Sequence, residues 1–516
     1  MNSMQNLPVS TSTFRDIIKY DFLYVDKTQH IYNLLKNQKG AYFLARPRRF
    51  GKSLLVSTLR SLFAGQKELF QNLWITQHSD YDFQTYPIFH LDFSHRVTSL
   101  AELIQIIHYA LDEIATQYQL TLTETYYITR FAELLSKLGQ LGRVVILIDE
   151  YDKPILDNLH SPARDEIKEA LKGFYTVIKA SDEYLRFVLL TGVTKFAKVS
   201  VFSGLNNLQD LTMDERYADM LGITQTELET YFADRLPLLA EKENLSLSAL
   251  LDKIRFWYNG YRFSTRAITV YNPYSTLHLF EEQQFKFHWF ETGTPTFLIN
   301  LIKEKQWSEL PKEKIVLAED FASYEIEKLQ LLPLLFQTGY LTITDVSGTT
   351  ETLYQLDYPN LEVKVGFIRQ LLADFTDVAA PSSYLFKIVK LFKQNDLNEV
   401  LETLKIFFAN IPYSIQIAQE KYYQTIFFAI FELLGFEITT EVKTNRGRID
   451  AVVQVEGRVY IFEFKLFGTK DEALAQIKQQ KYYEKFLATT TEIYLIGVEF
   501  SQTERNIGQW IIERVP

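Results

Sequence analysis

Apolar and polar residues alternate over the first 300 positions in a way that predicts strands and helices in turn. Apolar-rich segments of strand length lie at 41–45, 87–93, 144–148 and 186–190. Longer segments with apolar residues at helical spacing lie at 54–63, 100–114 and 131–138. Strands that are apolar along their length, with helices between them, are typical of parallel sheets covered on both faces. We therefore expect an α/β domain with a parallel sheet in the N-terminal part.

The pattern changes in the second half of the chain. Residues 302–408 are rich in helical periodicity, with a hairpin-like interruption at 338–356. The last hundred residues then follow the order α-β-β-β-α-β, with helices at 413–434 and 473–486 and with strands that include 451–455, 459–466 and 492–498. This order predicts a second, smaller α/β domain at the C-terminus.

Composition supports a globular protein and excludes several classes of site. Of the 516 residues, 47% are hydrophobic and none is cysteine, so disulfides, thiolate zinc sites and cysteine nucleophiles are excluded. The 54 Lys and Arg against 64 Asp and Glu give a net charge of −10, which argues against a chain-wide basic surface for nucleic acid. We find no signal peptide and no apolar stretch of membrane-spanning length. We expect a cytoplasmic protein with no membrane partner.

A loop motif separates the strand at 41–45 from the helix at 54–63. It reads Arg-Pro-Arg-Arg-Phe-Gly-Lys-Ser. Its end matches the phosphate-loop signature, in which backbone N–H groups surround the phosphates, a lysine reaches the β- and γ-phosphate oxygens and a hydroxyl binds Mg²⁺. Arg46 replaces the first glycine, and the loop arginines either contact phosphate or pair with acids elsewhere. The predicted ATP-binding residues are Arg46, Arg48, Arg49, Phe50, Gly51, Lys52 and Ser53, with Ser53 on Mg²⁺.

Two acids, Asp149 and Glu150, follow the strand at 144–148 directly. At the end of such a strand an Asp can hold Mg²⁺, and a Glu can orient or deprotonate the attacking water. A helix N-cap beside a solvated acid is the simpler alternative, but the phosphate-loop motif earlier in the chain favours the nucleotide site. Thr191 or Thr194 could sense the γ-phosphate or form only a turn, and Thr191 is the candidate. A catalytic Glu directly after the Asp suits ATPases with an added central strand.

Several longer motifs accompany these residues, and together they resemble the bacterial AAA-ATPase-like family over residues 5–300. They are Tyr24–Thr28, Arg46–Ser53, Leu147–Pro154, Thr191–Lys195, Phe202–Asn207 and Trp257–Phe263. In that family the phosphate loop commonly reads Arg-Pro-Arg-Arg-Phe-Gly-Lys-Ser, so the resemblance implies that relatives share the missing glycine. It also implies a likeness to signal-transducing ATPases, which often carry a C-terminal nuclease-like domain.

A second group of chemically active residues lies on the hairpin predicted near the C-terminus. Asp450 opens the strand at 451–455, and Glu463 and Lys465 project from one face of the strand at 459–466. Two carboxylates at a hairpin can bind Mg²⁺, while a lysine stabilises the hydroxide nucleophile or the pentavalent phosphate. A hairpin with a solvated Asp and a simple Glu–Lys pair is the structural alternative.

The helix predicted at 413–434 offers one more metal ligand, Glu420 or Glu432, of which we favour Glu420. With it, residues 409–516 resemble the PD-(D/E)XK nuclease superfamily. Asp450 and Glu463-Phe464-Lys465 match the core motif, Ile449 replaces the usual proline, and Gln476 stands where many members place a polar helix residue. The resemblance implies Mg²⁺-dependent cleavage of nucleic acid. Residues 410–516 hold 12 Lys and Arg against 14 Asp and Glu, which indicates only a modest basic face.

These patterns predict four segments. They are an AAA-like phosphate-loop ATPase domain at 1–220, a lid or winged-helix-like module at 221–300, a helix-rich middle region at 301–408 and a restriction-endonuclease-like domain at 409–516.

The preferred hypothesis is an ATP-hydrolysing enzyme whose nucleotide state controls a Mg²⁺-dependent nuclease domain, with ATP and Mg²⁺ as cofactors. The alternative is a non-catalytic signalling or scaffolding ATPase whose nuclease-like domain only binds nucleic acid or a partner. A slow nucleotide switch that stays loaded is a third possibility. The sequence leaves the oligomeric state open, including a homo-oligomer with an arginine finger from a neighbouring subunit.

Overall fold

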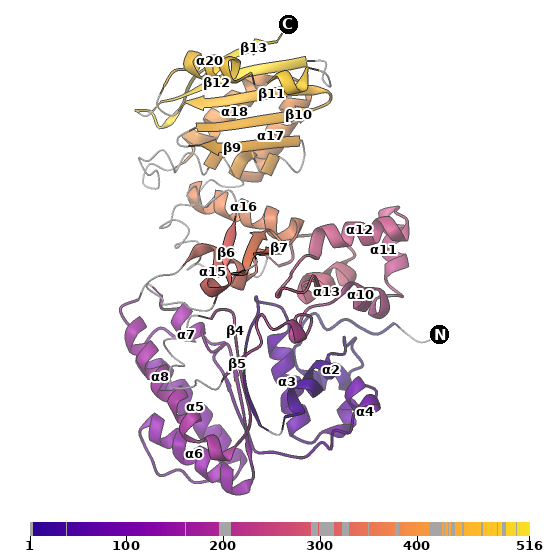
Figure 1. Ribbon diagram of the computed structural model, residues 1–516, viewed down its shortest axis with the longest axis vertical. Helices are drawn as coiled ribbons and strands as arrows, with labels where there is room; N and C mark the ends of the chain where they lie inside the picture. The colour runs from indigo at the N-terminus through magenta and orange to yellow at the C-terminus, as the bar shows by residue number, and fades with distance from the viewer. Residues whose placement is uncertain are drawn as a thin grey trace. The chain divides into compact units, whose positions relative to one another are not determined.

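The structure is a computed structural model of the chain, which forms two compact units (Figure 1). One unit comprises Met1–Gly293 with Lys312–Val363, and the other comprises Thr294–Pro311 with Lys364–Pro516. The described residues are 4–37, 39–159, 161–195, 208–289, 298, 314–321, 330–348, 350–376, 381–411, 426–427, 429–431, 433–434, 439–445, 448–465, 468–481, 483–487, 492–501 and 503–515.

The first unit is built on a parallel five-stranded sheet with the order β2-β3-β4-β1-β5. Its strands are β1 (Gly40–Ala45), β2 (Ile88–Asp92), β3 (Val144–Asp149), β4 (Leu185–Gly192) and β5 (Gln209–Asp210). Strand β4 is inserted between β1 and β3, so the added central strand expected of this ATPase class is present. It comes after β3 in the chain, whereas β2, which precedes β3, lies at the edge.

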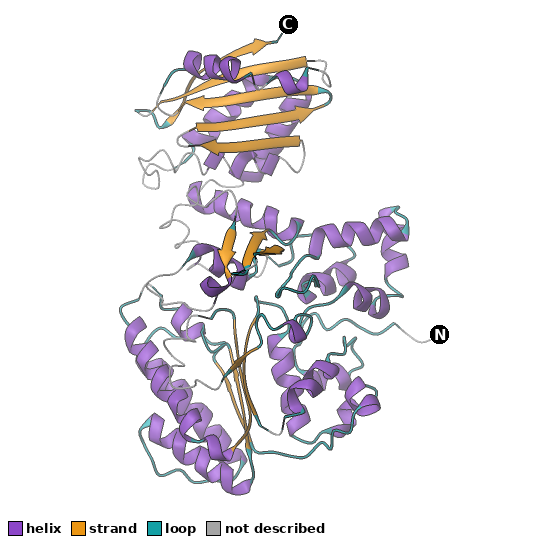
Figure 2. Cartoon of the chain, viewed as in Figure 1, coloured by secondary structure: helices purple, strands orange, loops and turns teal. Residues whose placement is uncertain are grey.

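Helices cover both faces of this sheet (Figures 1 and 2). One face carries α5 (Leu100–Gln117), α6 (Tyr127–Leu141) and α8 (Arg164–Ala180), and the other carries α2 (Thr28–Leu35), α3 (Lys52–Phe63) and α4 (Trp74–His78). Both faces of the strands are therefore buried, as their unbroken apolar character predicts. The short helix α1 (Phe14–Lys19) packs beside α3 on one face, and α7 (Lys153–Leu156) packs beside α8 on the other.

The first unit also contains a helical group and a small sheet. The helices are α10 (Gln225–Tyr231), α11 (Leu236–Glu243), α12 (Leu247–Tyr258) and α13 (Pro273–Glu282). A capping box at Thr224 and Glu227 begins α10. The small antiparallel sheet comprises β6 (Ile315–Leu317), β7 (Thr342–Ser347) and β8 (Leu353–Asp357). Helix α15 (Leu331–Thr338) lies between β6 and β7 in the chain. The hairpin expected at 338–356 is thus present.

The second unit contains a five-stranded mixed sheet with the order β13-β12-β11-β10-β9. Only β11 and β12 pair in parallel. Its strands are β9 (Thr439–Asn445), β10 (Arg448–Val455), β11 (Arg458–Lys465), β12 (Glu492–Ser501) and β13 (Asn506–Arg514), and its helices are α16 (Leu361–Thr376), α17 (Pro381–Lys393), α18 (Leu397–Ala409) and α20 (Lys470–Gln480). Strand β13 is an element that the sequence pattern did not predict.

Successive side chains of β11 point to opposite faces of this sheet, each of which is covered by helices. Val459 and Ile461 pack against Leu474 and Ile477 of α20. Residues of opposite parity form ring contacts on the other face, where Phe462 meets Phe392 of α17. Glu463 shares the parity of Ile461, so the strand geometry directs it toward the α20 face.

The mixed α/β architecture predicted from the sequence is confirmed in both units. The four-segment division stays a prediction. Within the described residues, no helix combines the length and the apolar character needed to cross a bilayer.

Candidate functional site

Strand parity brings the residues of the first site to one face of the parallel sheet. Val145 and Leu147 of β3, with Leu189 of β4, belong to the core on the α3 side. Asp149 and Thr191 continue the same alternation at the carboxyl ends of these strands, where ligands bind in open α/β sheets. Helix α3 begins beside them at Lys52.

The phosphate loop depends on two residues in the left-handed backbone region. Gly51 has a φ of 86° and Arg49 a φ of 65°. A side chain at such a φ is strained, so glycine at position 51 avoids a strain that Arg49 bears. The Lys52 ammonium is buried and donates to the carbonyls of Arg46 (3.1 Å) and Pro47 (3.0 Å). Burial lowers the pKa of Lys52 from its ordinary value.

Asp149 and Thr191 form a buried pair at the strand ends. The Thr191 hydroxyl donates to Oδ1 of Asp149, and the Glu150 backbone N–H donates to the same oxygen at 3.0 Å. Both bonds use Oδ1, so Oδ2 is the oxygen that a cation can take. Glu150 has a φ of 52°, and burial raises the pKa of its carboxyl group while the Lys52 ammonium opposes that rise.

Asp152 is a further buried acid, which belongs to the motif at Leu147–Pro154. Its carboxylate accepts from the backbone N–H groups of Val193 (3.1 Å) and Thr194 (2.7 Å) and from the Thr194 hydroxyl (2.7 Å). It therefore fixes the turn after β4. Its spacing, three residues after Asp149 with a threonine turn later in the chain, is a signal that could have identified it.

The Arg46 side chain is buried among backbone carbonyls and an aromatic ring. Its guanidinium donates to the carbonyls of Thr212 (2.7 Å) and Tyr217 (3.2 Å) and lies 4.2 Å from the centre of the Phe263 ring. Burial lowers the pKa of Arg46 to about 9. The sequence left open phosphate or acids as partners of this arginine, but the bonds go to backbone carbonyls and tie the loop to the segments at Thr212 and Tyr217.

The other predicted loop residues differ in exposure. Arg48 is half-buried, and its carbonyl accepts the Trp289 indole N–H at 3.2 Å. Arg49 is exposed, with its guanidinium 4.9 Å from the centre of the Tyr274 ring. Phe50 is buried against Tyr261 and Phe263. Ser53 is exposed in the first turn of α3.

An apolar pocket lies beside the phosphate loop. It is lined on one side by Gly51 and the first turn of α3 and on the other by residues that precede and begin α10 and α13. The lining includes Val25, Gly51, Leu54, Ile223, Pro273 and Leu277. A flat, largely apolar group joined to a phosphate at the loop would fit this surface. The walls of this pocket come from distant segments of the chain, so no local sequence pattern indicates it.

The second site follows from strand register. Asp450 pairs directly with Glu463 across β10 and β11, and Lys443 of β9 pairs with Asp450. Directly opposite residues of an antiparallel pair share a face. The backbone thus brings Asp450, Glu463 and Lys465 together on one face, as the sequence predicts for the hairpin.

Glu463 and Lys465 are in contact inside the second unit. The Lys465 ammonium lies 3.5 Å from Oε1 of the fully buried Glu463 and also donates to Oε1 of Gln476 on α20. Helix α20 therefore supplies the polar residue that was expected from sequence. The preferred metal ligand, Glu420, and its alternative, Glu432, lie outside the described residues.

Both of these regions match known protein families. Residues 8–202 match a family model described as a predicted AAA-ATPase, and residues 418–510 match one described as PD-(D/E)XK nuclease superfamily. A protein of Azotobacter chroococcum mcd 1, described as "Uncharacterized protein in vnfD 5'region", is 39% identical over 537 aligned positions, which cover 99% of each chain.

Proposed function

This chain belongs to the family of AAA-ATPase-like proteins with a C-terminal PD-(D/E)XK nuclease-superfamily domain, and from that premise we propose an ATPase whose nucleotide state controls a Mg²⁺-dependent nuclease. The observation that carries the proposal is the presence of two chemically matched sites in one chain. Lys52 lies beside the Asp149–Thr191 pair, and Glu463 contacts Lys465 opposite Asp450.

We propose that ATP binds with its phosphates at the loop and its base in the adjoining apolar pocket. The Lys52 ammonium then exchanges two neutral carbonyl partners for phosphate oxygens, which are stronger acceptors because they carry charge. Val25, Leu54 and Pro273 line the space that would take the purine. The loop backbone and the first turn of α3 contribute N–H groups to the phosphates.

The residues present fit a magnesium ion at the first site. Oδ2 of Asp149 and the exposed hydroxyl of Ser53 are hard oxygen ligands of the kind that Mg²⁺ prefers. Bound Mg²⁺ would neutralise charge on the phosphates. Glu150 orients the attacking water and accepts its proton, and Thr191 holds Asp149 in place through its hydroxyl. Asp149 and Thr191 thus serve to position the metal ion, whereas Glu150 acts directly on the reacting water.

At the second site, Asp450 and Glu463 are the proposed metal ligands. Glu463 is fully buried and carries a carboxylate, and Lys443 and Lys465 lie at neighbouring register positions. Bound Mg²⁺ would activate the water that attacks the phosphodiester. Lys465 stabilises the charge that develops on the phosphate, and Gln476 holds its ammonium in position.

The rival function is a signalling or scaffolding ATPase whose nuclease-like domain binds without cutting. The modest charge of residues 410–516, with 12 Lys and Arg against 14 Asp and Glu, favours the form of this rival in which the domain binds a partner, because avid binding of nucleic acid usually requires a clear excess of cationic side chains.

A cleavage assay on single- and double-stranded DNA and on RNA separates these functions. Each substrate is tested with and without Mg²⁺ and ATP. The expected result is Mg²⁺-dependent cleavage whose rate changes with ATP, and Lys52→Ala should remove the ATP response. An unchanged rate and ATP response in Lys52→Ala would overturn the coupling. If Glu463→Ala folds normally and keeps full biological activity, the rival is correct.

A further inference from the structure

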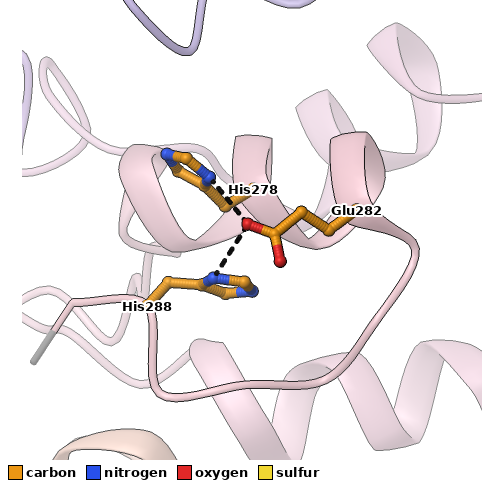
Figure 3. A group of neighbouring side chains, drawn as sticks. All are labelled: His278, Glu282 and His288. Atoms are coloured by element: carbon orange, nitrogen blue, oxygen red, sulfur yellow. Dashed lines mark hydrogen bonds and ion pairs between the residues drawn. The ribbon is translucent and has the colours of Figure 1, made fainter. Parts of the chain in front are cut away.

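Three side chains of known metal-binding type converge at the end of α13 (Figure 3). His278 and Glu282 are one turn apart on this helix, so they share a face. The chain then reverses at Gln283, which has a φ of 50°, and returns to place His288 opposite them. Nδ1 of His278 lies 3.3 Å from Oε1 of Glu282, and Nδ1 of His288 lies 3.8 Å from the same oxygen. The candidate ligand atoms all lie within 4.8 Å of one another.

The contacts of the His288 ring are compatible with a cation bound at Nδ1. Nε2 of His288 lies 3.4 Å from the carbonyl oxygen of Gln284. A carbonyl can only accept, so a neutral His288 carries its proton on Nε2 and presents the lone pair of Nδ1 to Glu282. A lone pair facing a carboxylate oxygen is repulsive unless a cation or a second proton lies between them. A carbonyl on the far ring nitrogen is also the usual second-shell partner of a metal-bound histidine.

Burial and charge prepare the three groups as ligands. The His288 side chain is 1% exposed and the His278 side chain 21%, so both rings are largely withdrawn from water. Lys286 donates to the other carboxylate oxygen, Oε2 of Glu282, at 2.7 Å. The Lys286 ammonium thus holds Oε2, while Oε1 faces both imidazoles.

We propose that His278, Glu282 and His288 bind a divalent transition-metal ion, with Zn²⁺ as the best match. Two imidazole nitrogens and one carboxylate oxygen suit Zn²⁺, Co²⁺ or Ni²⁺, whereas Mg²⁺ prefers oxygen ligands alone. The Glu282 side chain is 33% exposed, so water can supply a fourth ligand. The three ligands share no residue with the proposed nucleotide and nuclease sites.

The ion would fix a segment that touches the phosphate loop. Trp289 follows His288 directly. Its backbone N–H donates to the buried Glu362 at 2.8 Å, and its indole N–H donates to the Arg48 carbonyl at 3.2 Å. Metal binding at His288 should therefore restrain Trp289 and support the loop that we propose binds ATP.

Isothermal titration of the full chain with ZnCl₂, after removal of metal with a chelator, tests the site. The Glu463→Gln background and excess Mg²⁺ suppress binding at the oxygen-rich sites. One Zn²⁺ per chain is expected, and Co²⁺ should give the visible absorption of a nitrogen-ligated ion. His278→Ala and Glu282→Gln should each weaken Zn²⁺ binding by on the order of a hundredfold, because loss of a direct ligand exceeds the cost of losing a second-shell partner.

His95→Ala is the matched control, since it removes an exposed histidine of the same unit. It should bind Zn²⁺ as the parent protein does. His288 is buried and its replacement could unfold the segment, so Glu282→Gln, which keeps size and shape, is the decisive variant. Absence of Zn²⁺ binding in the parent protein, or binding unchanged in both His278→Ala and Glu282→Gln, would overturn the proposal.

Discussion

The two candidate sites hold their lysines in different ways. Lys52 donates to two backbone carbonyls of its own loop, at 3.1 and 3.0 Å. Lys465 lies 3.5 Å from the Glu463 carboxylate and donates to the Gln476 amide oxygen. The first lysine thus has neutral partners, and the second has an anionic one.

This difference indicates what each site requires before it can act. An incoming phosphate offers Lys52 a charged partner in place of neutral ones, so anion binding is favourable at once. Lys465 already balances a buried carboxylate, and it can turn to a substrate phosphate only when another cation balances Glu463. We infer that the first site depends mainly on nucleotide and the second mainly on metal.

The largest expected effect comes from Glu463→Gln, which removes the proposed metal ligand and keeps the shape of the side chain. Mg²⁺-dependent cleavage should fall by about 10²- to 10³-fold, as when one charge-stabilising group is lost from an active site. ATP hydrolysis should persist, because the phosphate loop is untouched. Steady-state cleavage and phosphate-release assays on the same preparation measure both.

Glu456→Gln is the control for this change, since Glu456 is an exposed residue in the turn between β10 and β11. It should leave both rates near those of the parent protein. If Glu463→Gln cleaves as fast as the parent protein, Glu463 is not needed for cleavage. The difference between the partners of Lys52 and Lys465 would then have no role in catalysis.

Asp152→Ala should have the next largest effect, on stability. The substitution leaves the N–H groups of Val193 and Thr194 and the Thr194 hydroxyl without their carboxylate partner. Unsatisfied buried groups cost about 1–3 kcal/mol each, so the first unfolding transition in urea should lose at least about 3 kcal/mol. Asp165→Ala, at an exposed position, should change stability by less than about 0.5 kcal/mol. Equal midpoints would refute a buried structural role for Asp152.

Sequence patterns could predict what depends on local order along the chain. The strand ending in Asp149-Glu150, the glycine of the phosphate loop and the pairing of Asp450 with Glu463 all follow from short-range periodicity and strand alternation. The partners of Arg46 could not be predicted this way, because its guanidinium binds carbonyls at Thr212 and Tyr217, more than 160 positions away. Long-range contacts of this kind depend on tertiary packing and leave no periodic signal.

The pH dependence of ATP hydrolysis tests the proposed role of Glu150 at the first site. Burial raises the pKa of Glu150 above its ordinary 4.5, and the negative charge of bound ATP acts in the same direction. If ionised Glu150 accepts a proton from water, kcat should fall about tenfold per pH unit below that raised pKa. The acid limb should therefore lie above pH 4.5. Intrinsic fluorescence at each pH confirms that the protein remains folded.

A kcat that stays constant down to pH 4.5 would contradict a role for Glu150 as proton acceptor.

The smallest expected effect separates the arginines of the phosphate loop. Burial is the main reason that the pKa of Lys52 is lowered, and the nearby Arg48 guanidinium contributes to it. The Arg48 charge also acts on Glu150, so it belongs to the electrostatic surroundings of the proposed phosphate site. Arg48→Ala should weaken ATP binding several-fold, or about 1 kcal/mol. Titration with a fluorescent ATP analogue at low salt measures this change.

Arg49→Ala is the matched control, because it removes the same charge one position along the loop. The Arg49 side chain is exposed and lies over the Tyr274 ring, so its loss should change ATP affinity by less than about twofold. A larger loss for Arg49→Ala than for Arg48→Ala would mean that the exposed arginine reaches the phosphates. In that case the loop rearranges when nucleotide binds, and the carbonyl contacts of Lys52 describe only the nucleotide-free arrangement.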